Sequence, residues 1–136
     1  MNNYIAAAIV LCFLVALVPQ SAIQTRNHLL ISECQAVIEE AKEEAKHEGY
    51  FTDEIIQHME NEFAAIGVDT SRMTENLTRT IKYRKNSVDE TEYIDYKIGI
   101  PIDQIVAAPS FFGIDEDDNK YIYYFEGKIP SERVVR

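Results

Sequence analysis

The chain opens with an apolar run that passes into an amphipathic pattern. Residues 4–18 (YIAAAIVLCFLVALV) contain no charged or strongly polar side chain. Further along, apolar side chains recur at steps of three and four residues, the period of one helical face. They are Leu30, Cys34, Val37, Ile38, Ala41 and Ala45. Gly49 can adopt the left-handed conformation that ends a helix. We therefore expect helical structure from the apolar run to Gly49.

A second, shorter helix is expected after Gly49. Thr52 can cap its first turn, where Asp53 and Glu54 suit the positive end of the helix dipole. Its predicted buried stripe consists of Ile55, Ile56, Met59, Phe63 and Ile66, and Gly67 would end it. Two antiparallel helices are the natural interpretation.

After Ser71 the pattern changes to the alternation of strands. Strands are predicted at 77–84, 91–101 and 120–126, with a polar turn at 86–90. Lys82 or Arg84 would pair with Asp95 across the outer face of the first hairpin. The fold class is therefore α+β, with an N-terminal hydrophobic helix continuing into an amphipathic helix, a second helix and a small antiparallel three-stranded sheet, a lollipop.

The apolar run divides the chain into an anchor at 1–25 and a small soluble α+β domain at 26–136. A spanning helix needs about 17 to 20 apolar residues, and Ala22 with Ile23 extends the run across Pro19. The length also suits a signal peptide, but no Lys or Arg precedes the run and a cut after Ala22 would put Gln20 where a small residue is expected. We expect a retained single span with the domain outside. Pro19 either kinks the helix or separates anchor from domain.

Charge narrows the choice of partners. The net charge is −10, and residues 31–66 hold ten acids against Lys42 and Lys46. Nucleic-acid binding depends largely on Lys and Arg, so no nucleic-acid partner is expected. One helical face carries a row of carboxylates, which is either a solvated face or a surface for a basic partner. The row comprises Glu33, Glu39, Glu40, Glu43, Glu44 and Glu48.

The two cysteines cannot pair within one chain if they share a helix. Cys12 and Cys34 would then lie about 33 Å apart at 1.5 Å per residue, whereas a disulfide needs Cα atoms within about 7 Å. Each is either a small hydrophobe on a helix face or a site of pairing between chains.

The connection 102–119 carries two further features. Phe111 and Phe112 lie in an apolar stretch that is either a lid on the core or a contact between subunits. Asp115, Asp117 and Asn119 place oxygen ligands at alternate positions, as calcium requires, although the glycine and distant Glu of an EF-hand are absent. A solvated acidic turn is the alternative, and no other cofactor is expected. No zinc pair, nucleophile elbow, phosphate loop or Cys-x-x-Cys motif occurs, so we expect no enzyme.

The order of these pieces resembles type IV pilin-like proteins, and most of all the TadE-like pseudopilins of Gram-positive bacteria. The resemblance is carried by residues 41–66 (AKEEAKHEGYFTDEIIQHMENEFAAI), the strand at 77–83 and residues 126–132 (EGKIPSE). No basic leader precedes the apolar run, and Tyr4 and Ile5 stand where main type IV pilins carry a Glu.

The resemblance implies a pilin-like subunit of a surface filament, secretion or conjugation apparatus. Such a protein lies in the cell membrane as a single span before assembly, and in an extracellular filament or at the cell surface afterwards. It associates with itself or with other pilin-like subunits through residues of the apolar helix and the connection, here Tyr4, Ala8, Leu11, Val15, Pro19, Phe111 and Phe112. The alternative is a membrane-anchored or secreted binding module that does not polymerise.

Overall fold

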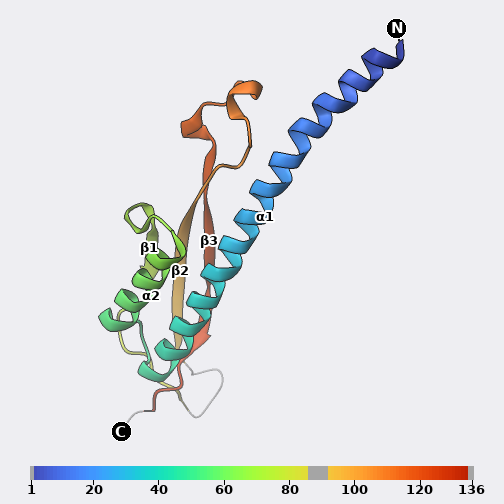
Figure 1. The fold of residues 1–136 in the computed structure, drawn as a ribbon. Helices are drawn as coiled ribbons and strands as arrows, with labels where there is room; N and C mark the ends of the chain where they lie inside the picture. The colour runs from blue at the N-terminus through green and yellow to red at the C-terminus, as the bar shows by residue number, and fades with distance from the viewer. Residues whose placement is uncertain (1, 86–91, 135–136) are drawn as a thin grey trace. The chain divides into compact units, whose positions relative to one another are not determined.

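The computed structural model describes residues 2–85 and 92–134, so the turn expected at 86–90 lies outside the described residues. The layout is α+β: a long N-terminal helix, a second helix and a three-stranded antiparallel sheet in the order β1-β2-β3 (Figure 1). The elements are α1 (Asn2–Glu48), α2 (Asp53–Ile66), η1 (Thr70–Arg72), β1 (Thr74–Leu77), β2 (Tyr93–Asp103), η3 (Pro109–Phe112), η4 (Glu116–Asp118) and β3 (Lys120–Pro130). The predicted fold class is confirmed.

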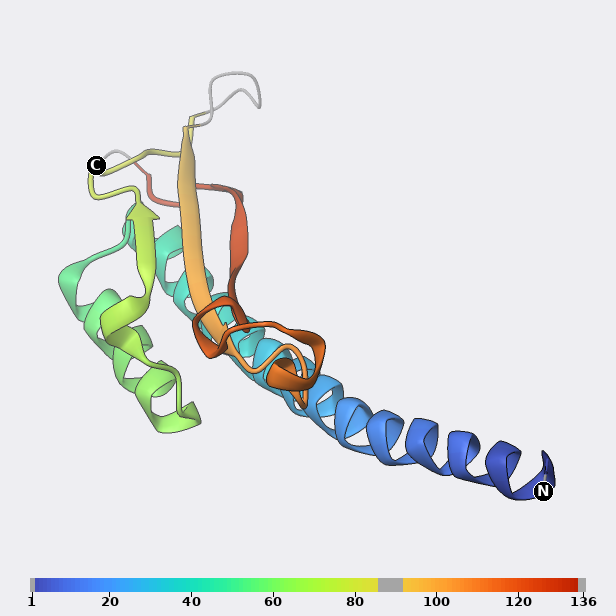
Figure 2. The ribbon, with the colours of Figure 1, turned by 90° about the horizontal axis from the view of Figure 1, so that it is seen from above.

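The chain forms two compact units. Unit 1 combines Met1–Leu30 with Ile102–Tyr121, and unit 2 combines Ile31–Pro101 with Ile122–Arg136. Helix α1, β2 and β3 each contribute residues to both units. Unit 1 therefore holds the apolar part of α1 and the connection between β2 and β3, while unit 2 holds α2 and most of the sheet (Figures 1 and 2).

Local cap chemistry sets the helix ends, as predicted. Gly49 follows α1 with φ 86°, and its N–H donates to Ala45 O at 2.8 Å. Thr52 caps α2 because its Oγ1 accepts a hydrogen bond of 3.2 Å from Ile55 N. Gly67 ends α2 in the left-handed conformation.

The core of unit 2 lies between the two helices and one face of the sheet. The predicted stripes are largely confirmed: α1 buries Cys34, Ile38, Ala41 and Ala45, and α2 buries Ile55, Ile56, Met59 and Phe63. Along β2, Ile94, Ile98 and Ile100 are buried while Tyr93, Asp95 and Lys97 are exposed. The opposite sheet face is open to solvent in the first half of β2, whereas Gly99 and Pro101 further along that face are buried.

Tyr96 links the sheet to α1. The Lys42 Nζ lies 5.2 Å from the centre of the Tyr96 ring, so α1 packs on the face that carries Tyr96. The ring also covers Gly127 of β3, where an added Cβ would lie only 2.9 Å from the Tyr96 hydroxyl. The missing side chain at Gly127 thus leaves the space that the aromatic ring fills.

The outer face pairs opposite charges, but not the pair expected. Asp95 contacts Lys128 at 3.2 Å, and Lys97 contacts Glu126 at 2.8 Å. The expected pairing of Asp95 with Lys82 or Arg84 is wrong. Thr78 bonds to the Asp95 backbone on that edge of β2, and the chain then leaves the edge, so that Lys82 N bonds to Gly49 O instead.

The predicted strand at 77–84 is also wrong. The observed strand β1 ends at Leu77, and the following backbone bonds to other segments. Lys82 N donates to Gly49 O at 2.9 Å, and Arg84 N donates to Arg133 O at 2.7 Å. Alternation alone did not identify these partners. The second and third strands were predicted at the right places, but β2 and β3 both extend further, to Asp103 and Pro130.

The outer sheet face has no room for a side chain at Gly99. An added Cβ would meet Thr74 Oγ1 and would lie 2.8 Å from both Ile122 Cγ2 and Tyr124 Cε1. We expect Gly99→Ala to lower the free energy of unfolding by about 1–3 kcal/mol through overpacking. Chemical denaturation measures this loss.

Thr74→Ala is the matched second change. It removes the closest obstacle, so the double variant Gly99→Ala/Thr74→Ala should lose less stability than the sum of the two single variants. Additive losses would show that Gly99 is not held by this contact.

Candidate membrane and assembly surface

The apolar half of α1 is a regular helix that the described residues of the protein leave uncovered. Every residue from Asn2 to Pro19 is exposed, and Tyr4 keeps 81% of its surface open. The helix is long and apolar enough to cross a membrane. A continuous apolar surface of this kind is unfavourable in water, and a membrane-spanning segment is one setting in which it would be covered.

Five of the seven predicted assembly residues lie on one side of this helix; the other two, Phe111 and Phe112, lie in η3. Tyr4, Ala8, Leu11, Val15 and Pro19 are spaced by four, three, four and four residues. Such spacing puts them within one narrow stripe, here called the assembly stripe. All five side chains are exposed.

Helix α1 continues through Pro19 without a break. The interpretation of Pro19 as a boundary that ends the helix is therefore wrong. Proline lacks the N–H that would bond to Val15 O, and beyond it two hydroxyl groups bond back to carbonyl groups of the preceding turn. Ser21 Oγ donates to Val18 O at 2.8 Å, and Thr25 Oγ1 donates to Ser21 O at 2.9 Å.

Just beyond the apolar run 4–18, the chain between β2 and β3 attaches to α1. Gln20 Nε2 donates to Ile105 O at 2.9 Å, while Gln20 Oε1 accepts from Ala107 N at 3.0 Å. Two helical turns further along α1, Asn27 Nδ2 donates to Gln104 O at 3.2 Å. We call these three hydrogen bonds the loop clasp.

The loop clasp lies where the side chains of α1 begin to be covered by the protein. Within the described part of unit 1's helix, the half-buried residues are Gln20, Ile23, Asn27 and Leu30, at spacings of three, four and three. These residues occupy one helical face. Cover by the protein's own chain therefore begins at Gln20.

Asn119 holds the loop together from inside. Its Oδ1 accepts hydrogen bonds from Ile105 N at 3.0 Å and Val106 N at 2.7 Å, and its Nδ2 donates to Val106 O at 3.0 Å. The residue is buried. A buried amide with three such bonds stabilises the loop, whereas leaving these groups unpaired would cost free energy.

The same bonds bear on the predicted calcium ligands. Asp115, Asp117 and Asn119 do not form a common site in the structure. Asn119 Oδ1 already accepts hydrogen bonds from two N–H groups, and Asp117 pairs with Lys120 at 3.0 Å. Asp115 is exposed at the start of η4. Over residues 2–85 and 92–134, no three His, Cys, Asp or Glu side chains form a metal-sized group. Calcium binding stays a prediction.

Phe111 and Phe112 do not close the core. They remain 83% and 60% exposed, in a T-shaped pair with ring centres 5.3 Å apart. The interpretation of this stretch as a lid is therefore wrong. The rings are instead displayed by the short η3 turn, which Gly113 ends in the left-handed conformation.

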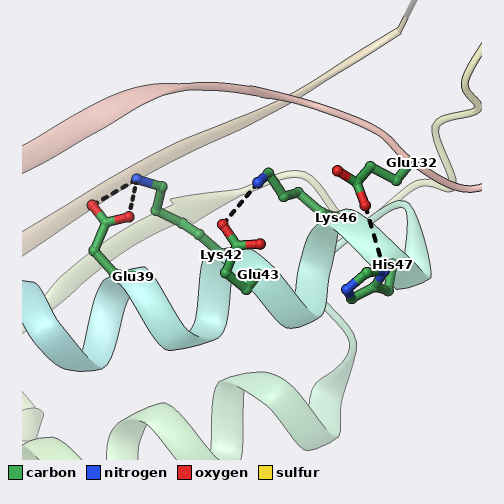
Figure 3. Close-up of polar contacts among 6 residues, drawn as sticks. All are labelled: Glu39, Lys42, Glu43, Lys46, His47 and Glu132. Atoms are coloured by element: carbon green, nitrogen blue, oxygen red, sulfur yellow. Dashed lines mark hydrogen bonds and ion pairs between the residues drawn. The ribbon is translucent and has the colours of Figure 1, made fainter.

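The carboxylate row of α1 is exposed and partly neutralised (Figure 3). Lys42 Nζ contacts both Glu39 oxygens at 2.8 Å, and Lys46 Nζ contacts Glu43 at 2.7 Å. Partial burial opposes the charge of Lys42, but the hydrogen bond to Glu39 and the nearby Tyr96 outweigh it and raise the lysine pKa. The described residues offer no ion-pair partner to Glu33, Glu40 or Glu44.

The polar residues that could suggest catalysis have structural partners. Ser131 is buried, and its Oγ donates to Lys82 O at 2.7 Å. His47 Nδ1 lies 3.6 Å from Glu132 on the surface (Figure 3). The absence of an enzymatic activity stays a prediction.

Comparisons of the chain with protein-family models, curated proteins and solved structures find no match. The pilin-like resemblance therefore stays an expectation, and the surface itself must carry any functional argument.

Sequence reasoning missed the residues that build the clasp. Gln20 was considered only as a polar residue after the apolar run and as an argument against cleavage after Ala22, and Asn27 was not considered. A signal was present: Gln20 and Asn27 are polar residues seven apart, on the face that Leu30 and Cys34 continue. Their partners, 77 to 87 residues away in sequence, carry no such signal.

Gln20→Ala should loosen the loop. Losing two hydrogen bonds of about 1 kcal/mol each should speed amide exchange at Ala107 roughly tenfold or more, measured by hydrogen–deuterium exchange in detergent micelles. Gln24→Ala is the matched control, since Gln24 is exposed one turn away. Equal exchange in both variants would contradict the role of the clasp.

Cys34 is expected to be chemically inert in the folded protein. Burial, with help from the Glu33 charge, raises the thiol pKa from 9.0 to about 11, and the side chain is fully covered. In a Cys12→Ser background, alkylation at pH 8 should require denaturant. Rapid labelling without denaturant would contradict this burial and would reopen pairing between chains through Cys34.

The same shift makes stability depend on pH. The folded protein keeps the Cys34 proton where the unfolded chain releases it, so the contribution is complete below pH 9 and is lost as pH rises towards about 11. Cys34→Ala should flatten this part of the stability profile, measured by thermal unfolding.

Proposed function

We propose that this protein is a pilin-like subunit, a pseudopilin of a surface filament or of a secretion or conjugation apparatus, and that it assembles through the apolar half of α1. Before assembly this segment is a single span in the cell membrane. After assembly it packs among the same segments of sister subunits, and the folded domain is displayed at the cell surface or along an extracellular filament.

The observation that carries the proposal is the uncovered apolar helix. Its surface needs a partner of the same chemistry, and both a bilayer and a bundle of identical helices supply one. The apolar run is of marginal length for a bilayer. Exchanging lipid for sister helices removes that mismatch, because the helices then cover one another.

The assembly stripe supports the same proposal. Transmembrane helices associate through small residues that let their backbones approach closely. Ala8 is such a residue within the stripe, and Leu11 and Val15 flank it with apolar surface.

An anchored binding module that does not polymerise is the second candidate. One observation favours it: a groove of about 560 Å³ opens on the sheet of unit 2. Its lining mixes both signs of charge with neutral residues, and comprises Asn76, Leu77, Thr78, Asp95, Tyr96, Lys97, Glu126, Gly127 and Lys128. A module of this kind would work as a monomer.

A pair of alanine variants distinguishes these candidates. Ala8 lies on the stripe, and Ala6 lies about 160° away around the helix at 3.6 residues per turn. Leucine at either site keeps the helix apolar and able to insert. We expect Ala8→Leu to weaken the association between subunits by about 1–3 kcal/mol per contact through overpacking. This loss raises the concentration needed for assembly roughly tenfold or more.

The measurement is electron microscopy of full-length protein expressed with its native membrane machinery. Wild type and Ala6→Leu should form filaments, whereas Ala8→Leu and the charged Ala8→Glu should lose them. Membrane extraction checks that both leucine variants insert equally. Equal loss at both sites would contradict the stripe, and a dispersed monomeric wild type would favour the binding module.

A further inference from the structure

We infer that the turn at residues 107–113, which carries Phe111 and Phe112, is a second membrane contact: it lays both rings into the headgroup region of the bilayer that α1 enters. The inference rests on the membrane-anchoring part of the proposed function and is independent of polymerisation. The partner of this apolar surface in the inference is a phospholipid bilayer, and not another copy of the chain.

The loop clasp gives the direction in which the loop runs. Asn27 bonds to Gln104, whereas Gln20 bonds to Ile105 and Ala107. As the loop advances from 104 to 107, its attachment moves seven residues towards the N-terminus of α1, about 10 Å at 1.5 Å per residue. The loop thus advances towards the apolar segment.

The clasp also fixes the level of the turn relative to the membrane. Gln20 is two residues beyond Val18, where the apolar run 4–18 ends, about 3 Å along the helix axis. Phe111 follows Ala107 by four residues, which can span at most about 14 Å. The two rings are therefore tied to the place where α1 leaves the hydrocarbon.

The turn is built for contact with lipid. Residues 105–114 contain no charged side chain. Three of its backbone N–H groups are paired internally: Phe111 N donates to Ala108 O at 3.1 Å, Gly113 N to Ser110 O at 3.2 Å and Ile114 N to Pro109 O at 2.9 Å. Lipid offers no partners to free backbone groups, so this internal pairing is what a membrane-facing turn requires.

The exposure of the two phenylalanine rings to water supplies the driving force for their insertion into the bilayer. Two adjacent phenylalanines are held open in a compact turn, on the same unit as an uncovered apolar helix. Phenylalanine is among the residues that bury apolar surface at the headgroup and acyl boundary. The acidic residues 115–118 follow directly, so the contact suits neutral phosphatidylcholine better than anionic lipid, which would repel them.

Tryptophan fluorescence tests this inference, because the chain contains no tryptophan. Phe112→Trp and, as a second variant, Phe111→Trp place a reporter in the turn while keeping an aromatic ring. Leu14→Trp places the matched reporter in the apolar helix. Each full-length variant is inserted into phosphatidylcholine nanodiscs at one chain per disc, with spin-labelled lipid quenching either near the headgroup or deep in the acyl chains.

We expect the turn reporters to shift to shorter emission wavelengths on insertion and to lose more intensity to the shallow label than to the deep one. The Leu14→Trp reporter should lose more to the deep label. Quenching at Leu14→Trp without quenching in the turn would overturn the inference and leave the anchor intact. Quenching at neither position would overturn the membrane anchor itself.

Crowding distinguishes lipid from a second copy of the chain. At one chain per disc no other copy is present, so lipid quenching there supports the inference. If the turn reporters shift only when several chains share a disc, and without lipid quenching, the rings contact a neighbouring subunit and the inference is wrong.

Discussion

The structure depends on one constraint: α1 is a single unbroken helix with two incompatible surroundings. Residues 31–48 pack into the core of unit 2, where Cys34 and Ala45 are fully covered. Residues 2–18 keep their apolar side chains exposed. The buried part packs within the folded domain, while exposure of the other part to water is unfavourable. The proposed membrane attachment and the proposed assembly are two ways in which this exposure would be removed.

Gln20 marks the boundary between these surroundings. Its side-chain amide donates to one backbone carbonyl of the loop and accepts from one backbone N–H. Polar groups near the end of the apolar run are therefore hydrogen-bonded within the protein. Asn119 does the same from the loop side with three bonds. Two neutral amides are well suited here, because a charged side chain at this depth would carry a larger desolvation cost. Together they turn a long connection into an ordered part of unit 1.

Features set by local chemistry could be predicted from the sequence, and features set by distant partners could not. Gly49, Thr52 and Gly67 act within one helical turn, so the sequence indicated the helix ends correctly. Alternation also identified the buried face of β2. The same alternation at 77–84 was misleading, because Lys82 and Arg84 find backbone partners at Gly49 and Arg133. The loop clasp joins residues 77 to 87 positions apart, a distance across which neither periodicity nor propensity carries information.

The proposed membrane contact and the proposed assembly surface would be compatible, because the loop attaches to a different side of α1 from the assembly stripe. At 3.6 residues per turn, the clasp face at Gln20, Ile23, Asn27 and Leu30 lies about 100° around the helix from the assembly stripe. A subunit held by its loop against the bilayer surface would therefore still present the stripe to a neighbour. On assembly the stripe would exchange lipid for protein, and the two phenylalanines would leave the bilayer only if the helix is extracted. Retention of the rings in lipid would then oppose extraction, so the turn would act on the same equilibrium that assembly must shift.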